Sequence, residues 1–321
     1  MNKQLQFELW EECNSHCKFC YLGKENRCTP NRLKINACKN ALKMISDMSF
    51  YPEYNTLAYL GGEFFQGQLN DKDVKEAFMT LMKKTAELLN NEIVKKVWIY
   101  ATLTIGDQKD LYDTLKLFEN HKGELWILTS YDTIGRFHTK KMEDNWSYHM
   151  KKIHELYPEI KFNITTILSG DCIDKYLSGE LSFKKMMEEY HTEFFFKQPS
   201  TGGLHPAEFN EKVLPNFAPT RHKFLEFLRK FKAEESDLMW DKLFNIKYRA
   251  DLLYRNGNTD EQQMQENVRH KDSKVEVSLN FKSPETDTAK CGHLIAYTAY
   301  ADSDGCVLCD KHMIEDLTNN G

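Results

Sequence analysis

Residues 56–60, Thr-Leu-Ala-Tyr-Leu, are followed by Gly61, Gly62 and Glu63 and then by a segment of helical periodicity. The five residues form an apolar run of strand length, bounded by a glycine pair. The residues of one helix face then recur at regular spacing, at Val74, Phe78, Leu81, Thr85 and Leu88. This strand and this helix make one βα unit, and the chain repeats the unit on both sides.

The segments before and after this unit follow the same alternation. An earlier strand is predicted where apolar and polar residues alternate, at Leu5, Phe7 and Leu9. A helix after it starts at the signal Thr29-Pro30 and carries Ile35, Cys38, Leu42 and Ile45. Further strands are predicted at 93–104, 124–129, 160–168 and 192–196. Helices are predicted at 111–118, 142–156, 173–190 and 220–232.

Six βα units predict an α/β protein with a parallel sheet and helices outside it. We expect a partial (βα)6 TIM-like barrel over residues 1–200, with a doubly wound open sheet as the alternative. Residues 201–285 are predicted to be a helical and polar connecting region, and 286–321 a small cysteine-containing extension. In barrels and open sheets of this kind, chemistry gathers at the carboxyl ends of the strands.

Composition excludes several classes of protein. Of the 321 residues 41% are hydrophobic and 28% are charged, which fits a globular chain rather than a disordered one. The net charge of −5 argues against a protein dominated by nucleic-acid backbone binding. The chain shows no signal peptide and no apolar run long enough to span a membrane, so we expect a cytoplasmic protein. There, its nine cysteines would stay reduced and available for metal or chemistry.

Three of these cysteines follow the first predicted strand, in the loop Cys13-Asn-Ser-His-Cys17-Lys-Phe-Cys20. The spacing C-x3-C-x2-C can bring three thiolates to one compact metal centre. An iron–sulfur cube has four irons, so three thiolates leave one iron open to another ligand. A zinc site completed by His16, or three buried cysteines, are the alternatives.

This loop resembles that of the radical S-adenosylmethionine superfamily, including the aromatic Phe19 before the last cysteine. The resemblance implies a [4Fe-4S] cluster whose open iron binds S-adenosylmethionine and, after one-electron reduction, releases a 5′-deoxyadenosyl radical. Gly61, Gly62 and Glu63 are similar to the family's Gly-Gly-Glu motif, which holds the methionyl amino group. Two glycines also allow close approach to a backbone, and an acid beside them suits an ammonium.

Weaker similarities follow the later strands. Ser130 and Asp132 are similar to the Ser-x-Asp segment that many family members place near the ribose, although both residue types are also common helix caps. Asn163, on the fifth predicted strand, lies where many members direct a polar residue towards the cofactor. The glycine-and-glutamate pattern that some members carry on this strand is absent.

A second cysteine group lies near the C-terminus, around an Asp-Gly turn. It resembles the auxiliary-cluster extensions called SPASM or twitch domains, in a shortened form, and consists of Cys291, Cys306, Cys309 and the candidate ligand His312. The expected occupant is a second iron–sulfur cluster, with structural zinc as the alternative. Cysteines without a metal are the third interpretation.

The motifs indicate the cofactor but leave the substrate open. Members of the family with such extensions often modify peptides or proteins, which makes this the first hypothesis. Nucleoside or nucleobase modification is the alternative, since the aromatic content of 12% allows base stacking. A metal-binding protein without catalysis is the third. The resemblance further implies a flavodoxin- or ferredoxin-type electron donor.

Overall fold

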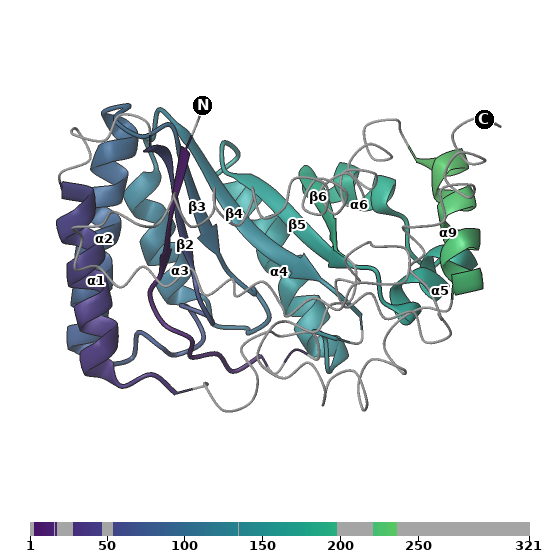
Figure 1. The fold of residues 1–321 in the computed structure, drawn as a ribbon, viewed down its shortest axis with the longest axis horizontal. Coiled ribbons are helices and arrows are strands. Elements are labelled where there is room, and N and C mark those ends of the chain that lie inside the picture. Colours follow the sequence, from purple (N-terminus) through teal and green to yellow (C-terminus); the bar gives the residue numbers. More distant parts are fainter. Residues whose placement is uncertain are drawn as a thin grey trace, which may run out of the picture.

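The computed structural model describes residues 3–15, 17, 28–46, 54–133, 135–197 and 221–235. Its centre is one parallel sheet of six strands, ordered β1-β2-β3-β4-β5-β6 (Figure 1). The strands are β1 (Lys3–Glu8), β2 (Tyr54–Leu60), β3 (Lys96–Tyr100), β4 (Glu124–Tyr131), β5 (Lys161–Ile167) and β6 (Thr192–Lys197). All six predicted strands are therefore present, and the α/β class is confirmed.

The strand order distinguishes between the two predicted architectures. Each strand pairs in parallel with the next strand along the chain, from β1 to β6. A doubly wound sheet reverses its order at a switch point, and this sheet has no reversal among its six strands. The sheet is wound in one direction, as in a partial TIM-like barrel.

Helices connect the strands and continue beyond the last one. They are α1 (Asn31–Ser46), α2 (Lys72–Asn90), α3 (Lys109–Leu115) with the 3-10 turn η2 (Lys116–Phe118), α4 (Lys140–Leu156), α5 (Gly170–Ser178), α6 (Phe183–Tyr190) and α9 (Arg221–Glu234). Figure 1 shows α1 and α2 side by side at one end of the sheet and α5 and α9 at the other. Among the described residues, no helix is long and apolar enough to cross a membrane.

One predicted helix is wrong in extent. Residues 173–190 form two helices, α5 and α6, rather than one. Gly179 ends α5 with φ of 84°, a left-handed conformation that glycine adopts without steric cost. Ser182 then caps α6, because its side chain accepts a hydrogen bond from the backbone N–H of Lys185. The apolar periodicity continues across both helices and concealed the break.

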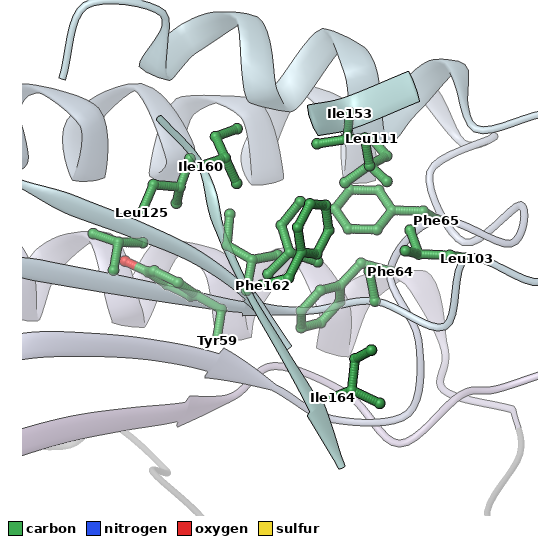
Figure 2. Packing of buried hydrophobic residues seen from close by; sticks show 14 of the residues in the cluster. Tyr59, Phe64, Phe65, Leu103, Leu111, Leu125, Ile153, Ile160, Phe162 and Ile164 are labelled. Carbon is green, nitrogen blue, oxygen red and sulfur yellow. The ribbon is translucent and has the colours of Figure 1, made fainter. Parts of the chain in front are cut away.

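The hydrophobic core lies between the sheet and its helices. Right-handed crossovers place the connecting helices of such a sheet on one face. Figure 2 shows strand residues of this face, among them Tyr59 and Phe162, in the buried cluster. The Tyr59 hydroxyl lies 2.5 Å from the Thr85 hydroxyl of α2, so even the polar end of this ring has a partner inside the core.

Helix α9 belongs to the packed body of the protein. Phe227 and Phe231 are both fully buried, and their rings contact Tyr176 of α5. The Lys230 ammonium donates hydrogen bonds to the carbonyls of Tyr176 and Leu177, at 3.1 and 2.8 Å. These carbonyls lie at the C-terminal end of α5, where a cation also complements the helix dipole.

The opposite face of the sheet is here called the inner face. Near the amino ends of β3, β4 and β5, charged side chains on this face form a row of ion pairs, here called the charge ladder. The Glu124 carboxylate pairs with Lys96 at 2.9 Å and with Lys161 at 2.6 Å. It also accepts a hydrogen bond from the indole nitrogen of Trp126, at 3.1 Å. The hydrogen bond from Lys161 is the main cause that lowers the pKa of Glu124 from 4.5 to about 2.

This ladder predicts a loss of stability in acid. A carboxyl with a depressed native pKa stabilises the fold above its ordinary pKa and loses that contribution as the pH falls towards 2. Because the side chain is 34% exposed, solvent screening limits the contribution to about 1 kcal/mol. Glu124→Gln should therefore lower the free energy of unfolding near pH 7 and flatten its decrease in acid. Urea unfolding at a series of pH values measures this, and parallel profiles for both proteins would contradict it.

Candidate functional site

The two predicted motifs are joined by backbone hydrogen bonds beyond the ends of β1 and β2. The Gly62 N–H donates to the Trp10 carbonyl at 2.8 Å, and the Glu63 N–H donates to the Glu12 carbonyl at 2.9 Å. The chain that leads into Cys13 thus runs directly beside the Gly-Gly-Glu segment. The structure therefore places the segment that leads into Cys13 and the segment 61–63 side by side at the carboxyl end of the sheet.

Both glycines are required by this close approach of two backbones. A Cβ atom at Gly61, where φ is 154°, would lie 2.2 Å from the Trp10 carbonyl oxygen. A Cβ atom at Gly62 would lie 2.2 Å from the Glu12 carbonyl oxygen and 2.3 Å from that of Glu11. The sequence suggested that the glycines admit a ligand. The structure shows that they make room for the backbone of residues 10–12, which continues from β1.

The Glu63 carboxylate organises the ends of two strands. It is 3% exposed, and one oxygen accepts hydrogen bonds from the backbone N–H groups of Phe64 and Phe65, at 2.8 and 3.0 Å. The other oxygen accepts from the backbone N–H of Thr102, beyond β3, at 2.6 Å. A carboxylate has about four acceptor positions, so three backbone donors leave capacity for one further donor.

Replacing Glu63 by glutamine tests this structural role. The amide would keep the shape of the side chain, but its NH2 group would face the Thr102 N–H or the pair at Phe64 and Phe65. We expect the variant to lose about 2 kcal/mol in free energy of unfolding, even without cofactor. Denaturant unfolding of the metal-free protein measures the loss. Glu87→Gln, at an exposed pair with Lys84, should change stability little.

If Glu63→Gln leaves the free energy of unfolding unchanged, the carboxylate has no structural role and acts only in ligand binding.

Aromatic residues hold this loop against the core. Phe64 and Phe65 are almost fully buried, and both rings contact Phe78 of α2. The Trp10 ring packs edge-on against Phe64, and its indole N–H donates to the Glu63 carbonyl at 2.7 Å. The backbone at Glu63 is thereby fixed from both sides.

Gln66 connects the cysteine loop to the chain beyond β3, and the sequence analysis did not identify it. Its side-chain NH2 group donates to the hydroxyls of Ser15 and Thr102, at 2.7 and 2.9 Å. Its side-chain oxygen accepts from the Asn14 backbone N–H at 3.1 Å, and its carbonyl accepts from the Asn14 side chain at 3.1 Å. Its place three residues after Glu63 was the only signal, and a buried glutamine has no motif of its own.

Cys13 and Cys17 are both half-buried free thiols. Burial raises the pKa of each above its ordinary value. The positive charge of Arg136 opposes this rise in the pKa of both thiols, and the charge of Cys13 raises the pKa of Cys17 further. The two cysteines therefore share one electrostatic environment, and a buried arginine is part of it.

Two further contacts fix the segment around Cys13. The Lys34 ammonium of α1 is buried and lies 2.6 Å from the Glu12 carboxylate. On the other side, the His138 ring nitrogen Nε2 lies 2.9 Å from the Ser15 carbonyl oxygen. The cysteine loop is thus bound to α1 and to the segment between β4 and α4, as well as to Gln66.

The remaining predicted residues lie on or after β4 and β5. Ser130 is half-buried near the end of β4. Asp132 is fully buried just beyond that strand, and its carboxylate accepts hydrogen bonds from the Gly135 N–H and, at 3.2 Å, from the Ser169 hydroxyl. Asn163 on β5 is 3% exposed, and its side-chain oxygen has no hydrogen-bond partner in the described part of the chain.

Several predicted residues lie outside the described part of the chain. These are Phe19 and Cys20 of the first loop, and Cys291, Cys306, Cys309 and His312 of the C-terminal group. Within the described ranges, no three His, Cys, Asp or Glu side chains gather as metal ligands. The third thiol of the first loop and the whole second centre therefore stay predictions.

Comparisons with known proteins do not assign this chain to a family. No protein-family model matches the chain, and no curated protein matches it. A solved structure described as native anSMEcpe with bound AdoMet aligns with a TM-score of 0.44 and 16% sequence identity. The alignment covers 79% of this chain and 62% of that one, so this chain spans less than two thirds of that structure. At this TM-score the likeness assigns neither a family nor a function.

The donor set nevertheless fits an iron–sulfur centre. Two free thiols share one environment on a loop whose backbone is bound at Glu12, Asn14 and Ser15. Thiolates are soft ligands that suit iron–sulfur clusters, and Arg136 is a cation next to them. Hydrogen bonds and charges around such a centre tune its properties.

Proposed function

We propose that this protein is a radical S-adenosylmethionine enzyme. One observation carries the proposal: the backbone pairing of residues 10–12 with residues 62–63, which brings the cysteine loop and the Gly-Gly-Glu segment side by side. Neither motif alone would be specific. Together, at the carboxyl end of a parallel sheet wound in one direction, they bring the Cys13 thiol into the electrostatic environment of Glu63.

In this proposal Cys13, Cys17 and Cys20 hold the cluster. Bound S-adenosylmethionine and a reduced [4Fe-4S] cluster would supply a 5′-deoxyadenosyl radical for hydrogen abstraction. The segment Gly61–Glu63 binds the methionyl amino group, for which the Glu63 carboxylate keeps one acceptor position. Ser130, near the end of β4, and Asp132, just beyond it, would contact the ribose, and Arg136 would offset the negative charge of the thiolates.

The proposed partners are an electron donor of the flavodoxin or ferredoxin type and a substrate. The first candidate substrate is a peptide or protein, on the resemblance of the C-terminal cysteines to auxiliary-cluster extensions. A nucleoside or nucleobase is the second candidate. The half-exposed aromatic side chains of the inner face, Trp98, Tyr100 and Trp126, favour this second class.

Anaerobic reconstitution with iron and sulfide tests the proposal. We expect about four irons per chain for the first cluster, since a cube holds four, and more if the C-terminal group also takes iron. The reconstituted protein, reduced in the presence of S-adenosylmethionine, should release 5′-deoxyadenosine. Fewer than three irons per chain would contradict the proposed cluster. Iron binding without release of 5′-deoxyadenosine would contradict the proposed enzymatic activity and support the metal-binding alternative.

A further inference from the structure

The strand register places large side chains next to each other on the inner face. We call Trp98, Tyr100, Trp126, Leu128 and Asn163 the wall of this face. Trp98 of β3 pairs with Trp126 of β4, and Tyr100 pairs with Leu128. Leu128 in turn pairs with Asn163 of β5. Because side chains alternate along a strand, these five residues share the face opposite the helices, in two adjacent rows.

The indole ring of Trp126 has a hydrogen-bond acceptor for its N–H and is held in one orientation. The Trp126 N–H donates to Glu124 at 3.1 Å, and the Lys161 ammonium lies 5.3 Å from the centroid of the Trp126 ring. Since Lys161 is itself paired with Glu124, the charge ladder of the inner face fixes the orientation of this ring. Trp126 therefore presents a preorganised aromatic surface.

Two polar atoms of the same wall have no partner among the described residues. There, the Trp98 indole N–H is a buried donor without an acceptor, and the Asn163 side-chain oxygen is a buried acceptor without a donor. Leaving such a group unpaired costs about 1–3 kcal/mol. A ligand or an ordered water can supply the missing partner of such a group.

We propose that the inner face binds the planar ring of a nucleobase through Trp98, Trp126 and Asn163. The indole surfaces stack on the ring, the Trp98 N–H donates to a ring carbonyl or aza nitrogen, and the Asn163 oxygen accepts from a ring N–H or amino group. A nucleobase carries both kinds of group on the edge of an aromatic ring. Among aromatic side chains, phenylalanine offers neither group and tryptophan offers only a donor, whereas a nucleobase carries donors and acceptors at several positions of its edge.

This ring is separate from the adenine of S-adenosylmethionine. Trp98 lies four residues before Thr102 in the chain. The Thr102 N–H donates to Glu63 at the carboxyl end of the sheet. At about 3.3 Å per residue, the row of Trp98 and Trp126 lies about 13 Å below that end, and the row of Tyr100 and Asn163 lies about 7 Å below it. The inference rests on the proposed function, because it names a substrate class that would lie beneath the proposed S-adenosylmethionine site, but ring binding itself requires no radical chemistry.

Isothermal titration calorimetry on the full chain tests the proposal without any turnover. The probes are uridine, cytidine, adenosine and guanosine, with N-acetyltyrosinamide and N-acetyltryptophanamide as models of peptide side chains. We expect at least one nucleoside to bind more tightly than both amides. Its affinity should persist in reconstituted protein saturated with S-adenosylmethionine and without reductant. No nucleoside binding, tighter binding of an amide, or competition by S-adenosylmethionine would overturn the proposal.

Substitutions locate the binding. Trp98→Phe keeps an aromatic ring but removes the donor, and Asn163→Leu removes the acceptor at similar volume. Each should weaken nucleoside binding about three- to tenfold, the effect of one neutral hydrogen bond. The matched control is Trp146→Phe on α4, whose indole N–H donates to Thr129 at 3.1 Å on the opposite face. This control should leave the affinity unchanged, and an equal effect of all three variants would refute the site.

Thermal unfolding of the ligand-free variants gives a second readout. Trp98→Phe removes a donor that has no partner, so the melting temperature should stay the same or rise. Trp146→Phe breaks a buried hydrogen bond, so its melting temperature should fall. If Trp98→Phe lowers the melting temperature as much as Trp146→Phe does, the indole N–H is already bound within the protein and the proposal fails. The iron and 5′-deoxyadenosine measurements are independent of this result.

Discussion

Replacement of Cys17 by alanine is expected to reduce the release of 5′-deoxyadenosine to the level of a protein-free control. Cys17 shares its environment with Cys13 and Arg136, and a cluster held by three thiolates has no spare protein ligand. Iron content after reconstitution should fall as well. The measurement is chromatographic quantification of 5′-deoxyadenosine after reduction with S-adenosylmethionine present.

Cys28 provides the matched control for this variant. It is an exposed free cysteine in the described chain just before α1, outside the C-x3-C-x2-C spacing. Cys28→Ala should retain both iron and product. Product release that persists in Cys17→Ala at the wild-type rate would point to a contaminating enzyme and would remove Cys17 from the cluster.

Replacement of Gly62 by alanine is expected to lower the free energy of unfolding by about 3 kcal/mol, at the upper end for overpacking. The added methyl group would lie within 2.3 Å of the carbonyl oxygens of Glu11 and Glu12, and a backbone cannot move aside as a flexible side chain can. Relief of this clash must separate residues 10–12 from residues 62–63. The variant should therefore also lose iron-binding capacity.

Gly106 is the control for the alanine substitution itself. A Cβ atom there would meet nothing closer than the Asn145 side chain, at 3.8 Å. Gly106→Ala should change stability by less than about 0.5 kcal/mol. Chemical denaturation of both variants without metal makes the comparison, and equal effects at the two positions would show that Gly62 has no special packing role.

The order of strands and helices was predictable because local periodicity reflects local burial. Alternation at Leu5, Phe7 and Leu9 predicted β1, and the spacing of Val74, Phe78 and Leu81 predicted α2. The break at Gly179 was not predicted, since an isolated glycine does not interrupt the apolar periodicity around it. Whether the sheet was a barrel segment or doubly wound also needed the structure, because both share the same local pattern.

The site was predictable in part for the same reason. Cysteine spacing and a glycine pair are local signals, so Cys13, Cys17 and the segment 61–63 could be identified from the chain alone. Gln66 could not, because its importance lies in bonds to Asn14, Ser15 and Thr102. A buried glutamine acquires such partners only when strands β1, β2 and β3 are placed side by side.

The sequence by itself therefore determined the α/β class, the succession of βα units, and the presence of a cysteine loop after one strand and a glycine pair after the next. Only the tertiary structure decided what the glycines and Glu63 contact. Trp10 and Glu63 are 53 residues apart, yet an indole N–H joins them at 2.7 Å. The physical reason is register: pairing of β1 with β2 selects which backbone meets Gly62 and which donors fill the Glu63 carboxylate. Register depends on the whole sheet, and no local pattern encodes it.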